Sequence, residues 1–272
     1  MNTLALTLVL STLAADPALV PLVAHRGESA DAPENTLAAI NLAWQRKVPV
    51  VEFDVHLTKD NRLICVHDKD TKRTTGVMKV VKESTAAELQ QLDAGSWKGK
   101  QFAGEKMPLI EEALATIPDG AKVLIEVKVG PEAIPPLVKA VEASGKSPEQ
   151  MIVIAFNSET VAEAKRRLPQ LKAYYLVGFK RDKQTGEWTP TLDQVLAEAQ
   201  KNKADGLDIS YQGPIDEEFV RRVRHFNLEL HTWTIDDAKV ARRYVDLGFD
   251  SITTNRAEAL RNELLSAPTG AQ

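Results

Sequence analysis

The sequence predicts a closed (β/α)8 barrel, or TIM barrel, with a small insertion after its second strand. Eight short apolar runs recur along the chain, and most of them are followed by an amphipathic stretch of helical length. The chain has 272 residues, and barrels of this class span roughly 250 residues as one domain. We therefore expect a single domain over residues 16–272.

The apolar runs are the predicted strands, and they cover residues 20–24, 50–55, 122–127, 151–155, 173–177, 206–209, 228–234 and 251–253. The first helix is predicted over residues 35–44, where apolar residues share one face and Asn35 or Thr36 lies near the start. The other helices are predicted over residues 131–144, 159–168, 191–201, 216–226, 236–247 and 257–265. We expect Asp216 and Asp236 to cap the helices that they begin.

The apolar run at residues 63–66 does not belong to the eight. It follows a turn-rich tetrad at residues 58–61 and lies too close to the second strand for a parallel crossover, so we expect an antiparallel hairpin. The insertion, about residues 56–107, then includes a helix at residues 85–92 and is expected to lie over the mouth of the barrel. The single cysteine, Cys65, is expected to be a small buried side chain, and it leaves no intrachain disulfide.

Residues 1–15 carry no charged side chain and are typical of a short secretory signal peptide, which predicts a periplasmic or secreted protein. The alternative is an apolar N-terminal helix packed on a cytoplasmic protein. The stretch is shorter than the roughly 20 residues that span a bilayer, and no cysteine follows it, so we expect no stable membrane anchor. A net charge of −4 without a long basic run argues against nucleic-acid binding.

Three carboxylates at predicted strand ends are candidate metal ligands. Glu52 and Asp54 lie two residues apart and therefore on one face of the second strand, and Glu126 ends the third strand. Oxygen ligands without cysteine favour one divalent metal, Mg²⁺ or Ca²⁺, over Zn²⁺. The alternative is a buried trio of acids that is paired with Arg26 and Lys128.

Two histidines at strand ends, His25 and His67, are the candidate general acid and base, because imidazole titrates near neutral pH. Cleaving a phosphodiester requires a proton to be removed from the attacking oxygen and another to be given to the leaving alcohol. His56, His225 and His231 are expected to be structural or surface residues, although His56 shares the face of Asp54.

Two cations near these acids are candidate phosphate ligands. Arg26 would hold phosphate oxygens through its planar guanidinium and Lys128 as a point charge. The string at residues 33–36 starts a helix, and its polar side chains either cap that helix or reach back to the loop after the first strand. Trp233 is expected to line the substrate pocket, and Trp97 either does the same or packs in the core.

The ordered motifs resemble the glycerophosphodiester phosphodiesterase family over about residues 20–260. The matching motifs are His25-Arg26-Gly27, Pro33-Glu34-Asn35-Thr36, Glu52-Phe53-Asp54-Val55, Val66-His67-Asp68, Arg73-Thr74-Thr75-Gly76, Leu92-Asp93-Ala94-Gly95, Glu126-Val127-Lys128 and Thr232-Trp233-Thr234. Each tripeptide is weak alone, but their common order is specific. Near the last strand the chain has Thr254-Asn255-Arg256-Ala257 where the family commonly has Thr-Asp-Arg-Pro; we expect Asn255 still to cap the last helix.

This resemblance implies a (β/α)8 barrel and metal-dependent hydrolysis of glycerophosphodiesters to an alcohol and sn-glycerol 3-phosphate. It implies Glu52, Asp54 and Glu126 as metal ligands, and His25 and His67 as the acid–base pair. Arg26 and Lys128 would contact the phosphate. It also implies that a glycerol hydroxyl can act as the internal nucleophile, giving a cyclic phosphate that water then opens.

Two other functions remain open at this point. A related barrel phospholipase acting on lysophospholipid or sphingomyelin would share the acids and the histidines. A binding protein on the same barrel would bind without catalysis, although all three acids and both histidines are present here.

Overall fold

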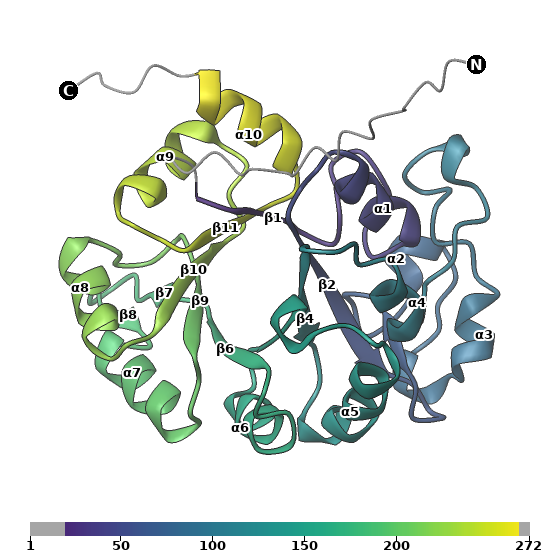
Figure 1. The fold of residues 1–272 in the computed structure, drawn as a ribbon, viewed down its shortest axis with the longest axis horizontal. Coiled ribbons are helices and arrows are strands. Elements are labelled where there is room, and N and C mark those ends of the chain that lie inside the picture. Colours follow the sequence, from purple (N-terminus) through teal and green to yellow (C-terminus); the bar gives the residue numbers. More distant parts are fainter. Residues whose placement is uncertain (1–19, 267–272) are drawn as a thin grey trace, which may run out of the picture.

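The computed structural model describes residues 20–266, so the predicted signal peptide lies outside the described residues. Eight parallel strands form a closed ring, because β1 (Leu22–Ala24) pairs with both β2 (Val50–Leu57) and β11 (Ser251–Thr254). Figure 1 looks into this ring, with the helices arranged around it. The predicted (β/α)8 barrel is confirmed.

Every predicted strand and helix has a counterpart in the structure. The remaining barrel strands are β4 (Lys122–Val127), β5 (Met151–Ala155), β6 (Lys172–Val177), β9 (Gly206–Ser210) and β10 (Glu229–Trp233). The predicted helices are α1 (Leu37–Gln45), α3 (Ala86–Gln90), α5 (Ile134–Ala143), α6 (Ser158–Arg167), α7 (Leu192–Lys201), α8 (Glu217–His225), α9 (Ala238–Asp246) and α10 (Ala257–Ser266). Short 3₁₀ turns lie at η1 (Val81–Glu83), η2 (Lys100–Phe102), η3 (Pro131–Ala133) and η4 (Pro148–Gln150).

Four short elements were not predicted. They are α2 (Lys72–Thr75), α4 (Ile110–Ala115), and a hairpin of β7 (Lys180–Arg181) with β8 (Trp188–Thr189). The hairpin strands are two residues long and have no apolar run. Helix α4 has six residues, fewer than two helical turns, so its periodicity is too short to stand out.

The helix caps agree with the sequence in part. The side chains of Thr36 and Asp216 accept backbone N–H groups at the starts of α1 and α8, as expected. The expectation for Asp236 is wrong, because Asp237 caps α9 by accepting from the backbone N–H of Val240.

The expected cap at Asn255 is also wrong. The buried carboxylate of Glu28 accepts from the backbone N–H groups of Ala257 and Glu258 at the start of α10. A carboxylate at a helix N-terminus is favourable because the free N–H groups carry partial positive charge. This contact joins the loop after β1 to the last helix of the ring.

The insertion begins with the predicted hairpin. Strand β3 (Leu63–Cys65) pairs antiparallel with β2, with Val55 opposite Cys65, and Cys65 is buried. The insertion has its own apolar cluster, formed by Ile64, Val66, Val81, Leu89, Ala94 and Met107. Figure 1 shows it at one side of the ring, beside α1 and α4, rather than over the centre. The expected position over the mouth is therefore wrong for most of the insertion, since this cluster packs outside the barrel.

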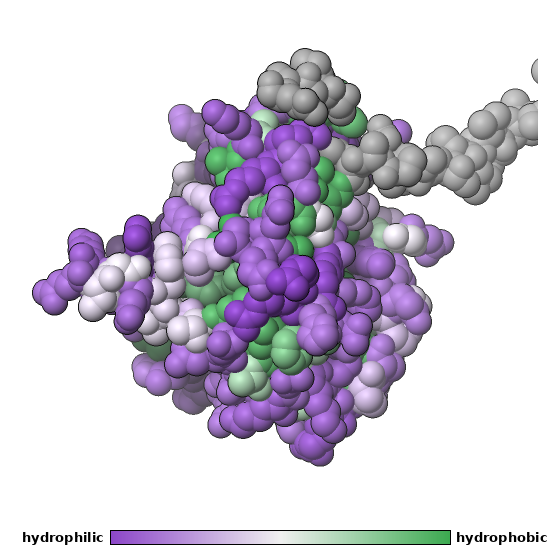
Figure 2. Space-filling model, turned by 90° about the vertical axis from the view of Figure 1, so that its left-hand side faces the viewer, coloured by the Kyte–Doolittle hydropathy of each residue, from purple (hydrophilic) through white to green (hydrophobic). Residues whose placement is uncertain are grey.

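The interior of the barrel is apolar through most of its depth. Its buried cluster consists of Val23, Val50, Leu124, Ile152, Ile154, Tyr174 and Leu176. On the side of α7 and α8, Figure 2 shows mainly hydrophilic side chains with apolar patches between them. Within residues 20–266, no helix combines the length and apolar character needed to cross a bilayer.

Candidate active site

The predicted site residues converge on a pocket of about 180 Å³ at the C-terminal ends of the barrel strands. The pocket is lined by His25, Arg26, Glu52, His67, Glu126, Lys128, Ile154, Phe156, Leu176, Asp208, Trp233, Thr234 and Thr253. Of the predicted site residues, only Asp54 does not line the pocket, because it is completely buried within the acid cluster. The structure thus brings together the groups that the sequence placed on separate strands.

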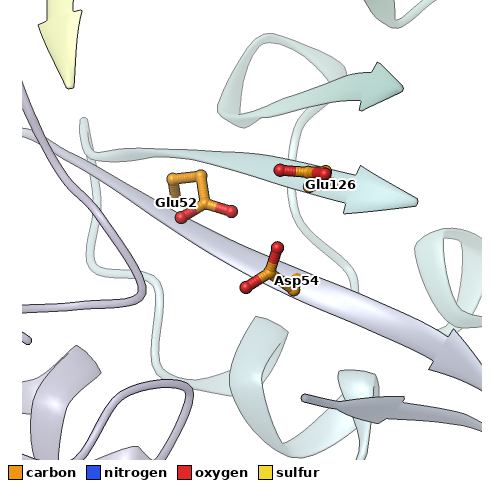
Figure 3. Close-up of side chains that lie close together, drawn as sticks. All are labelled: Glu52, Asp54 and Glu126. Atoms are coloured by element: carbon orange, nitrogen blue, oxygen red, sulfur yellow. The ribbon is translucent and has the colours of Figure 1, made fainter. Parts of the chain in front are cut away.

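Glu52, Asp54 and Glu126 form one cluster. Asp54 on β2 lies opposite Glu126 on β4 in the strand register, and one oxygen from each acid lies within 4.8 Å of the others. Figure 3 shows the three side chains on these neighbouring strands. Within the described residues, Glu52 Oε1 and Asp54 Oδ1 accept no hydrogen bond although both are buried. Buried carboxylate oxygens that accept no hydrogen bond suit a hard divalent cation.

Burial and mutual repulsion perturb these acids differently. Burial, followed by the charge of Asp54, raises the pKa of Glu52 well above its ordinary value and that of Glu126 to about 7. Burial alone would also raise the pKa of Asp54, but Arg26 and Lys128 reverse that effect and lower it. Asp54 therefore stays negatively charged at the centre of the cluster. A bound cation would favour the charged forms of its neighbours Glu52 and Glu126.

The loop after β1 fits Arg26 against the acids. Its backbone N–H donates to Glu52 Oε2 at 2.8 Å, and its Nε lies 3.1 Å from Asp54 Oδ2. The loop turns through a left-handed conformation at Arg26 and Gly27, with φ values of 57° and 80°. A Cβ at Gly27 would lie 2.4 Å from the carbonyl carbon of Ala39, so the close approach of α1 requires glycine.

Asn35 and Lys128 hold the acids from two sides. Asn35 Nδ2 donates to Asp54 Oδ2 at 2.8 Å, and Asn35 Oδ1 accepts from the backbone N–H of Asp54 at 3.0 Å. Lys128 Nζ lies 2.6 Å from Glu126 Oε1 and 3.4 Å from Asp54 Oδ1. The string at residues 33–36 therefore has both of its predicted roles: Thr36 caps α1, and Glu34 accepts from Arg26 Nη1 at 2.8 Å in the loop after β1.

His25 is oriented by an amide. Its Nδ1 lies 2.7 Å from Asn255 Oδ1, while Asn255 Nδ2 donates to Asp236 Oδ2 at 2.7 Å. Because the amide N–H is already directed at Asp236, the oxygen of Asn255 faces the ring and accepts from Nδ1–H. Nε2 of His25 is then left without a proton, 4.0 Å from Glu52 Oε2.

His67 is oriented by a carboxylate instead. Its Nδ1 lies 2.7 Å from Asp68 Oδ1, and Asp68 Oδ2 accepts from Arg73 Nε at 2.7 Å. Arg73 also makes two hydrogen bonds to Glu34, at 2.7 and 2.8 Å. His56 Nε2 lies 3.0 Å from the carbonyl oxygen of His67, so His56 is structural, as expected, and holds the backbone of the other histidine.

The aromatic side of the pocket is formed by Trp233 and Phe156. Their ring centroids are 5.5 Å apart in an edge-to-face arrangement, and Trp233 Nε1 donates to the carbonyl oxygen of Asp208. Trp97 is partly exposed and does not line this pocket.

Phe156 and Asp208 line the pocket but were not predicted from the sequence. Asp208 carries a usable signal, because it is a lone acid inside an otherwise apolar strand. Two other histidines lie away from the site, as expected: His225 is exposed on α8, and His231 stacks on Tyr174 and hydrogen-bonds to Ser251.

Known proteins share this fold and this sequence pattern. The chain is 33% identical over 256 residues to a glycerophosphodiester phosphodiesterase of Bacillus subtilis, covering 88% of this chain and 84% of that protein. A second one, from Caldanaerobacter subterraneus, is 33% identical over 246 residues and covers 89% and 96% of the two chains.

Among solved structures, an Oleispira antarctica phosphodiesterase in complex with the product sn-glycerol-3-phosphate superposes with a TM-score of 0.81. It is 27% identical and covers 91% of this chain and 98% of that one. The sequence also matches the profile of the Glycerophosphoryl diester phosphodiesterase family over residues 25–259, which contain every predicted site residue. By its match to the family profile and by its identity to these relatives, the chain belongs to the glycerophosphoryl diester phosphodiesterase family.

Proposed function

We propose that this protein hydrolyses glycerophosphodiesters to an alcohol and sn-glycerol 3-phosphate, using one divalent metal and the pair His25 and His67. The observation that carries this proposal is the buried three-acid cluster, two of whose oxygens accept no hydrogen bond, beside two histidines whose Nδ1 atoms are already bonded. The names of the relatives and the product bound in the Oleispira structure support the substrate class.

Glu52, Asp54 and Glu126 would hold the metal, because carboxylate oxygens are the preferred ligands of Mg²⁺ and Ca²⁺. When bound, such an ion supplies a positive charge that polarises a phosphoryl oxygen or lowers the pKa of a hydroxyl group. The pKa of Glu126, raised to about 7, supports this assignment. A bound cation would lower this pKa and so allow all three acids to be charged at neutral pH.

His25 is the better candidate for the base. Burial, followed by the charge of Arg26, lowers its pKa to about 4, so its ring is neutral at neutral pH. With its Nδ1–H donated to Asn255, Nε2 is free to take a proton from the attacking hydroxyl group. A base needs this tautomer, which an amide partner provides.

His67 is the better candidate for the acid. Its Nδ1 faces the carboxylate of Asp68, which can compensate a positive charge on the ring. Nε2 of His67 would then give its proton to the leaving alcohol. Arg26 and Lys128, which line the same pocket, would stabilise the charge that develops on the phosphoryl oxygens.

Release of glycerol 3-phosphate tests the proposal. The purified protein is incubated with Mg²⁺, Ca²⁺ or EDTA and with glycerophosphocholine, glycerophosphoethanolamine, lysophosphatidylcholine and sphingomyelin. We expect product from the two glycerophosphodiesters with a metal and none with EDTA. His25→Ala and Glu52→Ala should abolish this release, whereas His225→Ala, which changes an exposed histidine outside the pocket, should not.

Other outcomes lead to other functions. Preferred cleavage of lysophosphatidylcholine or sphingomyelin, measured as released choline because neither lipid yields glycerol 3-phosphate, would identify the barrel phospholipase. Metal-dependent binding without any product would identify the binding protein. Full activity in His25→Ala would contradict the assignment of the base.

We also propose that residues 1–15 direct export. The absence of charged side chains over this apolar stretch supports a signal peptide. Fractionation of cells that express the full chain tests it. The protein should be found outside the cytoplasm, and it should stay inside when residues 1–15 are deleted.

A further inference from the structure

The floor of the pocket carries two polar side chains without a partner. Asp208 on β9 and Thr253 on β11 are 1% and 2% exposed, and both line the pocket. Among residues 20–266, neither Asp208 Oδ1 nor Thr253 Oγ1 has a hydrogen-bond partner. Buried polar atoms are normally paired, because burial removes their hydrogen bonds to water and an unpaired atom has no hydrogen bond to replace them.

Asp208 lies deeper in the barrel than the aromatic wall. Asp208 is opposite Leu176 of β6 in the strand register, whereas Trp233 is opposite Ser210, two residues further along β9. Phe156, beside Trp233, is 47% exposed and marks the open end. A bound molecule therefore meets the aromatic pair at the entrance and Asp208 at the bottom.

The chemistry of the floor selects the group that reaches it. A phosphate is unsuited, because Asp208 would repel it and the cations Arg26 and Lys128 lie beside the acids of β2 and β4. A hydroxyl group suits a carboxyl group in either protonation state, since it donates to the charged form and both donates to and accepts from the neutral one. Burial also raises the pKa of Asp208 well above its ordinary value, which makes the neutral form accessible.

We propose that Asp208 and Thr253 form a hydroxyl subsite for the terminal C1 hydroxyl group of the glycerol moiety. The inference rests on the proposed function and adds an orientation to it: glycerol points into the barrel, and the alcohol that leaves points toward Phe156 and the entrance. The subsite makes the enzyme selective for glycerol over propane-1,2-diol, which has the same carbon chain and keeps the C2 hydroxyl group but lacks the terminal one.

Two substrates test the subsite directly. The full chain, with Mg²⁺ or Ca²⁺, is assayed with sn-glycero-3-phosphocholine and with the matching 2-hydroxypropyl phosphocholine. We expect the wild-type protein to prefer the glycerol compound in kcat/KM by about 10- to 100-fold, the scale set by the roughly 1–3 kcal/mol cost of leaving a buried polar group unpaired. Asp208→Leu and Thr253→Val should lose most of this preference by becoming slower on the glycerol compound alone, and Asp208→Asn should retain part of it.

Thr232→Val is the matched control. Thr232 also has a buried hydroxyl group without a partner in the described chain, but it does not line the pocket, so this variant should keep the wild-type preference. Thermal unfolding shows whether each variant folds. A variant that folds and keeps the full preference for glycerol, or that slows on both substrates equally, would overturn the subsite.

Binding separates this inference from the proposed function. Calorimetric titration measures the affinities for sn-glycerol 3-phosphate and for 2-hydroxypropyl phosphate. The wild-type protein should bind the glycerol compound more tightly, and Asp208→Leu should remove the difference; equal wild-type affinities overturn the subsite. If the wild-type protein cleaves neither diester, the proposed function fails, and the two affinities still decide whether the subsite exists.

Discussion

Replacing Glu52 with Gln should stabilise the metal-free protein and remove its response to divalent cations. The substitution keeps the size of the side chain and an oxygen that can accept from the backbone N–H of Arg26. It removes one negative charge from a buried cluster of three. The same residue should therefore have opposite effects on stability and on function.

The size of the gain follows from the geometry of the cluster. Two full charges at the 4.8 Å limit between the ligand oxygens repel by about 3.5 kcal/mol at an effective dielectric constant of about 20. Two effects relieve part of this repulsion: Glu52 can take up a proton, and the positive charge of Arg26 lies nearby. We therefore expect Glu52→Gln to raise the free energy of unfolding by about 1–2 kcal/mol. Each kcal/mol moves the Tm of a protein this long by about 2–4 °C, which predicts a rise of about 2–8 °C.

Thermal unfolding in EDTA and with added Mg²⁺ or Ca²⁺ measures both effects. At a metal concentration of about 100 times the Kd, the wild-type protein should gain about 2.7 kcal/mol, and Glu52→Gln should gain little. Glu28→Gln is the matched control, because Glu28 is also buried but caps α10 and pairs with Arg46. This control should lower the Tm and leave the metal response intact.

The gain should also depend on pH. The pKa of Glu52 is higher in the folded protein than its ordinary value of 4.5, so the folded state binds the proton more tightly than the unfolded state does. The destabilisation that the ionised Glu52 carboxylate causes is absent below about pH 4.5 and grows as the pH rises above that value. The reasoning is refuted if Glu52→Gln lowers the Tm in EDTA at pH 7, or if it keeps the full metal response.

Three further predictions concern the loops around the site. Asn255→Leu should lower kcat by about 10- to 100-fold with little change in KM, because it removes the acceptor of His25 Nδ1, and Asn255→Asp should keep most of kcat; steady-state kinetics on glycerophosphocholine decide it. Arg73→Ala should lower kcat/KM by about tenfold while the Tm changes little, since the Arg73 side chain is 44% exposed and Glu34 keeps its ion pair with Arg26; unchanged kinetics would show that the link is dispensable. Gly27→Ala should cost about 2–4 kcal/mol, measured by urea unfolding, because its Cβ meets backbone atoms at a positive φ.

The strands and most of the helices could be predicted because their signals are local. An apolar run between turn residues identifies β4 or β5 without knowledge of the rest of the chain. The end-of-strand rule then brings Glu52, Asp54 and Glu126 together, since neighbouring parallel strands place their ends at one edge. The cluster of three acids could therefore be predicted from strand order alone.

The remaining parts depend on contacts between residues far apart in the sequence. His25 and Asn255 are 230 positions apart, and nothing near Asn255 indicates that its amide faces a ring rather than a helix end. The choice between Asp236 and Asp237 as the cap of α9 depends on Thr254, whose hydroxyl group donates to Asp236 Oδ1 and so holds that carboxylate away from the helix start. The position of the insertion likewise depends on its own apolar cluster, whose residues are spread from Ile64 to Met107 and come together only in the folded chain.

The contacts that close the ring have a consequence for how activity appears during synthesis and refolding. The loop of His25 is held by Asn255, and Glu28 from the same loop holds the start of α10, so the first and last segments of the barrel complete each other. A nascent chain that has not yet released its last strand lacks the partner of His25 even if every earlier βα unit has formed. Recovery of turnover during refolding should therefore report the joining of the two ends of the chain, later than the return of helical circular dichroism.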